Sequence, residues 1–112
     1  MDIERWKSQI RKGAAELAVL AVLAERERYG VDILDAIRGS AGVELAEGTI
    51  YPLLNRLQKD GKLSSRWVED EGASHPRKYY RLTAEGRALL HEMREAWNAH
   101  TRAMARLTRG RR

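Results

Sequence analysis

The sequence contains no cysteine and no phenylalanine, and only two of its 112 residues are proline. Without cysteine the chain can have no disulfide, no thiolate zinc site and no cysteine nucleophile, and it suits a reducing cytoplasm. Without phenylalanine, leucine, tyrosine and tryptophan must fill the core. The size and the 43% hydrophobic content indicate one globular domain, spanning residues 1–112.

Long apolar runs are also missing from the sequence. None approaches the roughly 20 residues that a membrane-spanning helix needs, and the N-terminal stretch MDIERWKSQIRKG lacks the apolar core of a signal peptide. We therefore expect a cytoplasmic protein with no membrane partner.

The net charge of +5 comes from the end of the chain. Residues 102–112 contain five arginines and no acid, so residues 1–101 hold 16 basic and 16 acidic residues. The tail, residues 109–112 in particular, either is disordered or adds non-specific affinity for phosphates. Any nucleic-acid hypothesis must therefore rest on where charges lie in the body of the chain.

Residues 47–61, EGTIYPLLNRLQKDG, have the spacing of a helix with one aliphatic stripe. The stripe comprises Ile50, Leu53, Leu54 and Leu57. The other side carries Thr49, Pro52, Asn55, Arg56 and Lys59, with Tyr51 on the flank. This side has no acid and several hydrogen-bond donors, which suits the acceptor-rich major groove of DNA. An ordinary amphipathic surface helix has a similar pattern.

The neighbouring segments complete a helix-turn-helix pattern. Residues 30–38 form a short helix that Gly39, Ser40 and Gly42 end, and residues 2–25 form one long helix or two abutting ones. Gly13 either breaks that helix or lets another helix approach closely. Pro52 lies in a first helical turn if Thr49 is the N-cap, and it predicts a bend if the helix begins near Ala46.

Two runs of strand character follow, at residues 63–69 and 77–83, and they indicate a β-hairpin. The tip, residues 70–76, is rich in turn-forming residues, and Arg77 and Lys78 come directly after it. A helix-turn-helix followed by a hairpin with a basic edge describes a winged helix, in which the wing can follow phosphates. Residues 25–29 are interpreted as a charged connector.

The last helix is expected at residues 83–108, with Thr83 as its N-cap. Its apolar positions recur at intervals of three and four, a heptad seam that exceeds what a compact winged helix needs. The seam comprises Leu90, Met93, Trp97, His100, Met104 and Leu107. A second copy of the chain could pack against this seam, and the two copies would then form a two-fold dimer. Alternatively, residues 2–12 fold back over the seam.

These residues resemble the PadR family of bacterial transcriptional regulators. The resemblance rests on RKGAAELAVLAVL followed by RYG, on EGTIYPLLNRLQKDGKLSS and on RKYYRLTAEG. It implies a member of the short subfamily with one C-terminal helix, a dimeric repressor that binds a palindromic operator and is released by a small molecule or signal. In some short members a tryptophan of this helix stacks on flat hydrophobic ligands, and Trp97 occupies a similar position.

The predicted fold is therefore mainly α with a small β-hairpin, a winged helix-turn-helix with long N- and C-terminal dimerisation helices. Its parts are the N-terminal helix at 1–26, the helix-turn-helix and wing at 29–83, and the dimerisation helix at 83–108. The predicted function is that of a transcriptional regulator that binds double-stranded DNA at a specific sequence. The alternative is a winged-helix module for protein contacts, since fold alone does not fix function.

The candidate sites follow from this assignment. The candidate DNA-binding residues are Tyr29, Thr49, Tyr51, Pro52, Asn55, Arg56, Lys59, Arg77 and Lys78. Packing competes with DNA contact for Tyr51 and is favoured for Tyr29. The candidate dimer interface comprises Ile3, Trp6, Ile10, Leu90, Met93, Trp97, His100, Met104 and Leu107.

A few further residues are weighed by their chemistry. Trp97 with Met93 is also the candidate effector site, although an aromatic residue at a seam position is more often core. Trp6 and Trp67 are interpreted as core or interface residues. The three histidines have no metal-ligand spacing, and no catalytic motif or cofactor-binding motif is present.

Overall fold

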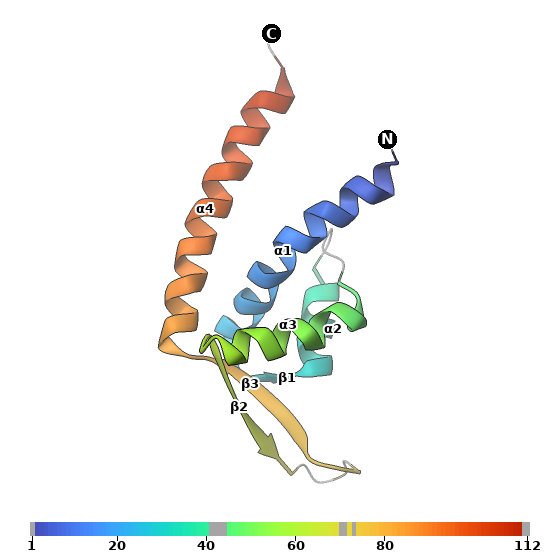
Figure 1. Ribbon diagram of the computed structural model, residues 1–112, viewed down its shortest axis with the longest axis vertical. Helices are drawn as coiled ribbons and strands as arrows, with labels where there is room; N and C mark the ends of the chain where they lie inside the picture. The colour runs from blue at the N-terminus through green and yellow to red at the C-terminus, as the bar shows by residue number, and fades with distance from the viewer. Residues whose placement is uncertain (1, 41–44, 70–71, 73, 111–112) are drawn as a thin grey trace.

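The computed structural model describes residues 2–40, 45–69, 72 and 74–110, and most of them are helical. Its elements, in chain order, are α1 (Ile3–Glu25), β1 (Arg28–Tyr29), α2 (Gly30–Arg38), α3 (Glu47–Lys59), β2 (Leu63–Val68), β3 (Arg77–Leu82) and α4 (Ala84–Arg109). Figure 1 shows α2 and α3 beside the sheet, with the β2–β3 hairpin extending from one end of the molecule as a wing. The predicted mainly helical winged fold is confirmed. Gly42 and part of the expected wing tip lie outside the described residues.

The sheet contains a strand that the sequence did not predict. β1 falls in the segment expected as a connector, and the strand order is β1-β3-β2 with antiparallel pairing throughout. β1 makes only two pairs, Arg28 opposite Tyr80 and Tyr29 opposite Tyr79. A strand of two residues is too short to produce a recognisable alternation, which is why the sequence pattern missed it.

The N-terminal segment is one continuous helix. The carboxylate of Asp2 accepts a hydrogen bond from the backbone N–H of Glu4 at 3.0 Å and caps the start of α1. A Cβ atom at Gly13 would meet nothing within 4 Å. Gly13 therefore neither breaks α1 nor admits a second helix of the described chain.

Pro52 lies inside α3, because the helix begins at Glu47 and Ala46 precedes it. The backbone N–H of Thr49 bonds to the carbonyl of Ala46 at 3.0 Å, so Thr49 is a helical residue and not the cap. Proline offers no N–H to the carbonyl four residues before it, which belongs to Gly48. Gly48 is exposed, so water can satisfy that carbonyl.

The base of the wing joins the end of α3 to the start of α4. Gly61 has the left-handed backbone conformation expected after α3, with φ of 76°. The hydroxyl of Thr83 donates to the carbonyl of Gly61 at 2.7 Å and accepts from the N–H of Gly86 at 3.0 Å. Thr83 is thus the predicted N-cap of α4, and it also fixes α4 to the end of α3.

The core lies between the C-terminal half of α1, the helices α2 and α3, and the sheet. Its largest fully buried side chains are Leu20, Leu23, Ile33, Ile37, Ile50, Leu54, Leu57 and Val19. The aliphatic stripe predicted for α3 is entirely buried. Leucine and isoleucine, not tryptophan, fill this core, so the expected contribution of tryptophan was wrong.

Arg28 is the buried charged side chain among the described residues, and its donors have hydrogen-bond partners. Its guanidinium donates to the carbonyl of Val22 at 2.9 Å, to Asp32 at 3.1 Å and to Glu25 at 2.9 Å. Because a buried cation needs partners for its donors, these bonds fix the end of α1, β1 and the start of α2 together.

Two helical segments project from this body. The first half of α1 and the second half of α4 are almost entirely exposed, and Figure 1 shows them extending on the side opposite the wing and diverging. They give the molecule its elongated dimensions of 60 × 31 × 21 Å.

Candidate nucleic-acid interface

The exposed side of α3 consists of an outer ridge and two flanks. At 3.6 residues per turn, Gly48, Pro52, Asn55 and Lys59 lie opposite the buried stripe, and all four are exposed. No acid occurs between residues 48 and 59. The ridge therefore presents a donor-rich surface of the kind that fits a groove lined with acceptors.

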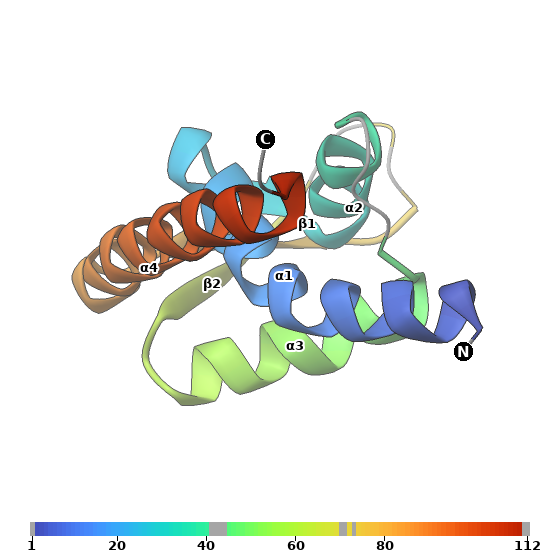
Figure 2. The same ribbon diagram turned by 90° about the horizontal axis from the view of Figure 1, so that it is seen from above.

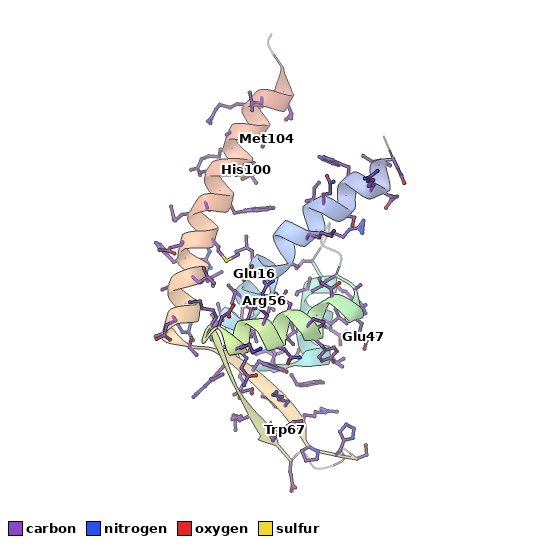
Figure 3. The ribbon with its side chains drawn as sticks, in the orientation of Figure 1. Glu16, Glu47, Arg56, Trp67, His100 and Met104 are labelled. Carbon is purple, nitrogen blue, oxygen red and sulfur yellow. The ribbon has the colours of Figure 1, made fainter. Side chains whose placement is uncertain are left out.

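One flank of α3 faces α1 and holds Arg56. A guanidinium nitrogen of Arg56 lies 3.3 Å from a carboxylate oxygen of Glu16 on α1, and Figure 3 shows the two side chains close together between these helices. Asn55 and Arg56 are neighbours in the sequence and were both predicted to bind DNA. The structure separates them, because Asn55 lies on the ridge and Arg56 pairs with α1.

The other flank of α3 carries Tyr51 and faces the start of α2. A Cβ atom at Gly30 would lie 2.6 Å from the Tyr51 ring, so only glycine there allows this close packing. Tyr51 nevertheless keeps 41% of its surface exposed. Packing and DNA contact are thus compatible for this residue. Burial raises the pKa of the neighbouring Tyr80, and an electrostatic interaction with Tyr51 adds to the effect.

Lys78 and Trp67 lie on the same face of the wing. They are paired across β2 and β3, and the Lys78 ammonium lies 5.9 Å from the centre of the Trp67 ring and 5.5 Å from that of Tyr80. Trp67 is 69% exposed and lies on the part of β2 far from α3 (Figure 3). Trp67 was expected in the core or at an interface, and it is not in the core of this chain, because β2 extends past the body of the protein at this point.

The opposite face of the wing carries Arg77. Its guanidinium stacks 4.6 Å from the centre of the Tyr29 ring, and Tyr29 meets Tyr79 edge to face at 5.4 Å. The packing role favoured for Tyr29 is therefore what the structure shows. Since Arg77 and Lys78 are adjacent in β3, their side chains point to opposite faces.

An ion pair fixes the wing to the body. Arg66 on β2 donates to both carboxylate oxygens of Glu27, with one N–O distance of 2.9 Å. The hydrogen bond from Arg66 and its positive charge hold the pKa of the Glu27 carboxyl below its usual value. This pair restricts the direction in which the wing projects.

Four residues around the start of α3 were missed by sequence reasoning. Ser8, Arg11 and Lys12 of α1, with Arg38 at the end of α2, line a hollow of about 510 Å³ beside Ala46 and Thr49. The helical spacing of Ser8 and Lys12 places both on the polar side of α1. That pattern alone does not reveal which helix they face.

The candidate dimer residues are divided between the core and the surface. Leu90 is buried in the core of its own chain, with 4% of its surface exposed, and Met93 packs against that core. Leu90 therefore cannot serve as an interface residue, because α4 first crosses the body before it projects. The apolar side chains exposed on the two projecting segments are Ile3, Trp6, Ile10, Trp97, Met104 and Leu107.

His100 lies between Trp97 and Met104 on the projecting part of α4 and is exposed. Residues 2–12 do not cover this seam within the chain, since Figure 1 shows the two segments diverging. Trp6, at 47% exposed, is not a core residue of the single chain.

The described part of the chain contains neither a candidate metal site nor a helix suited to span a membrane. Within the described ranges, no group of three or more histidine and acidic side chains is arranged to hold a metal ion. None of the described helices is both long enough and apolar enough to span a bilayer.

Comparisons with known proteins agree on one family. A family model described as "Transcriptional regulator PadR-like family" matches residues 19–92. The chain is 34% identical over 88 residues to a transcriptional regulator of Mycobacterium tuberculosis, with 79% of each chain covered. A crystal structure of a PadR family transcriptional regulator from Eggerthella lenta matches with a TM-score of 0.82 and 32% identity, covering 97% of this chain and 94% of that one. A PadR-like transcriptional regulator from Bacillus cereus matches with a TM-score of 0.81 and 28% identity, covering 92% and 99%.

Proposed function

Because the chain belongs to the PadR-like family of transcriptional regulators, we propose that it is a dimeric repressor that binds a palindromic operator. The family and these relatives are regulators, not enzymes. The observation that carries the proposal is the exposed outer ridge of α3, which has no acid, in a chain whose wing carries Lys78. The ridge would enter the major groove while the wing follows the adjacent backbone.

Within this proposal the exposed residues divide by chemistry. Asn55 has the paired donor and acceptor that adenine requires in the major groove. Lys59 and Lys78 would contact phosphates, which fix the register but carry no sequence information. Arg56 would contact DNA only after leaving Glu16.

The dimer would form through the exposed apolar side chains of α1 and α4. Neither projecting segment is covered within the described chain, and exposed apolar surface of this kind marks an interaction site. In a two-fold dimer the same surface on each copy covers its equivalent. Trp97 and Met93 would then lie near the boundary between the two chains. A flat hydrophobic effector could stack there on the indole of Trp97. Repacking of α4 around it would change the separation of the two α3 helices and release the operator.

The test begins with selection of genomic fragments that bind the purified protein. We expect one inverted repeat to be enriched, with an affinity that falls steeply as salt is raised. Asn55→Ala should weaken binding to the selected fragment by about 1–3 kcal/mol and relax the preference at one position of each half-site. Fluorescence anisotropy on selected and scrambled duplexes measures both effects.

The control is Gln58→Ala, which alters the half-buried neighbour of the ridge and should leave sequence preference unchanged. If the wild-type protein enriches no sequence and binds every duplex equally, the repressor proposal fails. A winged helix used for protein contacts would give that result.

A further inference from the structure

A groove runs between the first half of α1 and α3. Besides the hollow of about 510 Å³ beside Arg38, a second hollow of about 430 Å³ lies between α1 and α3. Lys12 and Thr49 line both hollows, so the two adjoin as one groove. In the view of Figure 2 α1 runs next to α3, and Figure 1 shows that the N-terminal part of α1 rises away from α3.

The charge of the groove is positive. Arg11, Lys12 and Arg38 line the first hollow, and none of its described lining residues is acidic. Arg11 also lies 3.6 Å from Glu4, which is outside the lining. Arg56 and Glu16 lie at the second hollow, where they form an ion pair. The described lining of the whole groove therefore has four cations and one carboxylate.

We infer that this groove holds phosphates of the DNA strand that runs on the α1 side of α3. The inference rests on the proposed function and extends it to a surface outside the helix-turn-helix and wing. A helix inserted in the major groove has a sugar-phosphate strand along each flank. The wing and Tyr51 lie on one flank of α3. The cationic groove lies on the other and shares Thr49 and Pro52 with the exposed side of α3.

The positive charge of the groove disfavours binding of the C-terminal end of a second copy of the chain. The C-terminal end of a second copy has five arginines and no acid in residues 102–112, so it would be repelled by Arg11, Lys12 and Arg38. A strand of phosphates carries the complementary charge.

The groove is also compatible with the proposed dimer. On α1, Ser8, Lys12 and Ala15 face the groove, whereas the apolar residues Ile3 and Ile10 lie on roughly the opposite side of the helix. A partner chain on the apolar side would leave the cationic side open to DNA.

Glu16 sets the strength of this contact. Its carboxylate is the one acid in the described lining, and it holds Arg56 against α1. Phosphates entering the groove would compete with Glu16 for the guanidinium of Arg56. Glu16→Gln would keep the shape of the side chain, remove the negative charge and leave Arg56 available to the DNA.

The experiment measures the affinity for DNA as a function of salt concentration. The variants are Lys12→Gln and the double variant Lys12→Gln with Arg38→Gln. The probes are the selected genomic fragment and a mixed-sequence duplex. Removing one phosphate-binding cation should make the slope of log affinity against log salt shallower by about 0.9. The change should be the same on both duplexes, because phosphates carry no sequence information. Glu16→Gln should bind both duplexes more tightly than the wild type does.

Lys7→Gln is the matched control. Lys7 lies on the same helix beside Glu4 and does not line the groove, so its removal lowers the net charge equally and should leave the slope unchanged. Because Lys12 is exposed, its substitution should not disturb the fold. A thermal melt of each variant checks this.

The outcomes separate the two proposals. If the wild type binds its selected fragment but Lys12→Gln has the wild-type slope, or the same slope as Lys7→Gln, the groove does not hold DNA and this inference is overturned. Weaker binding by Glu16→Gln would also contradict it. If the wild type has no sequence preference, the repressor proposal fails instead, and the slopes on mixed-sequence DNA still decide the role of the groove.

Discussion

Single residues decide where distant segments of this chain can touch. A Cβ atom at Gly86 would lie 2.1 Å from the backbone carbonyl oxygen of Lys62, so the start of α4 can pack on the base of the wing only without a side chain there. Gly30 likewise lets the Tyr51 ring approach because it has no side chain. Neither requirement is visible in the local pattern, because each glycine is explained by a residue more than twenty positions away.

We predict that Gly86→Ala lowers the free energy of unfolding by about 1–3 kcal/mol, because the clash is with backbone that cannot rotate away. The measurement is urea denaturation at a fixed protein concentration, since a dimer's stability depends on concentration. Gly13→Ala is the control. It adds a methyl group in open space and should raise stability by about 0.5–1 kcal/mol. Destabilisation at Gly13 would indicate that a partner chain packs there.

At the scale of elements, α4 is one continuous helix with two roles. Its first turns pack on the core through Leu90, and its later turns carry exposed apolar residues, with Leu107 75% exposed. Its 26 residues give a length of about 39 Å, more than the body can cover. A charged residue in place of Leu90 would therefore unfold the protein without testing the interface.

The interface itself is tested by the double substitution Met104→Glu and Leu107→Glu. We predict a folded monomer, because two carboxylates at these positions would face their equivalents across a two-fold axis without water. Sedimentation velocity gives the mass, and circular dichroism shows that the fold remains. Arg102→Glu with Arg106→Glu alters the opposite side of the same turns and should leave the dimer intact. A dimer in both variants would place the interface elsewhere.

For the whole molecule, the proposed function depends on a fixed separation between two copies of α3. The projecting helices lie on the side away from the wing (Figure 1), so pairing through them would leave both wings and both α3 ridges accessible. Dimeric regulators of this type bind half-sites about one duplex turn apart, roughly 34 Å. A rigid pairing would tolerate little change in that distance.

Lengthening the operator tests this geometry. Inserting about half a turn, roughly five base pairs, between the half-sites should reduce affinity to that of an isolated half-site, because the second half-site then faces away from the second α3. The same insertion outside the operator should have no effect. Electrophoretic mobility shift on the three duplexes measures the difference. Unchanged binding with the internal insertion would mean that the two chains do not bind as one rigid unit.

The sequence alone determined the elements, because helices and strands follow from periodicities within a few residues. The stripe through Ile50 and Leu57, the strand character of residues 63–69 and 77–83 and the cap at Thr83 are local signals of this kind, and they indicated α3, the wing and the start of α4 correctly. The motifs in residues 47–65 and 77–86 added the resemblance to the PadR family. The two-residue β1 escaped notice because it is stabilised by pairing with β3, fifty residues later.

Only the tertiary structure decided how side chains with similar chemistry are used. Arg56 pairs with Glu16 while Asn55 stays exposed, and Arg77 stacks on Tyr29 while Lys78 lies beside Trp67. Leu90 is buried although the heptad continues past it to exposed residues. In each case the deciding contact comes from an element far away in sequence. Chain order fixes which side of a helix or strand a residue occupies, but packing determines what that side meets.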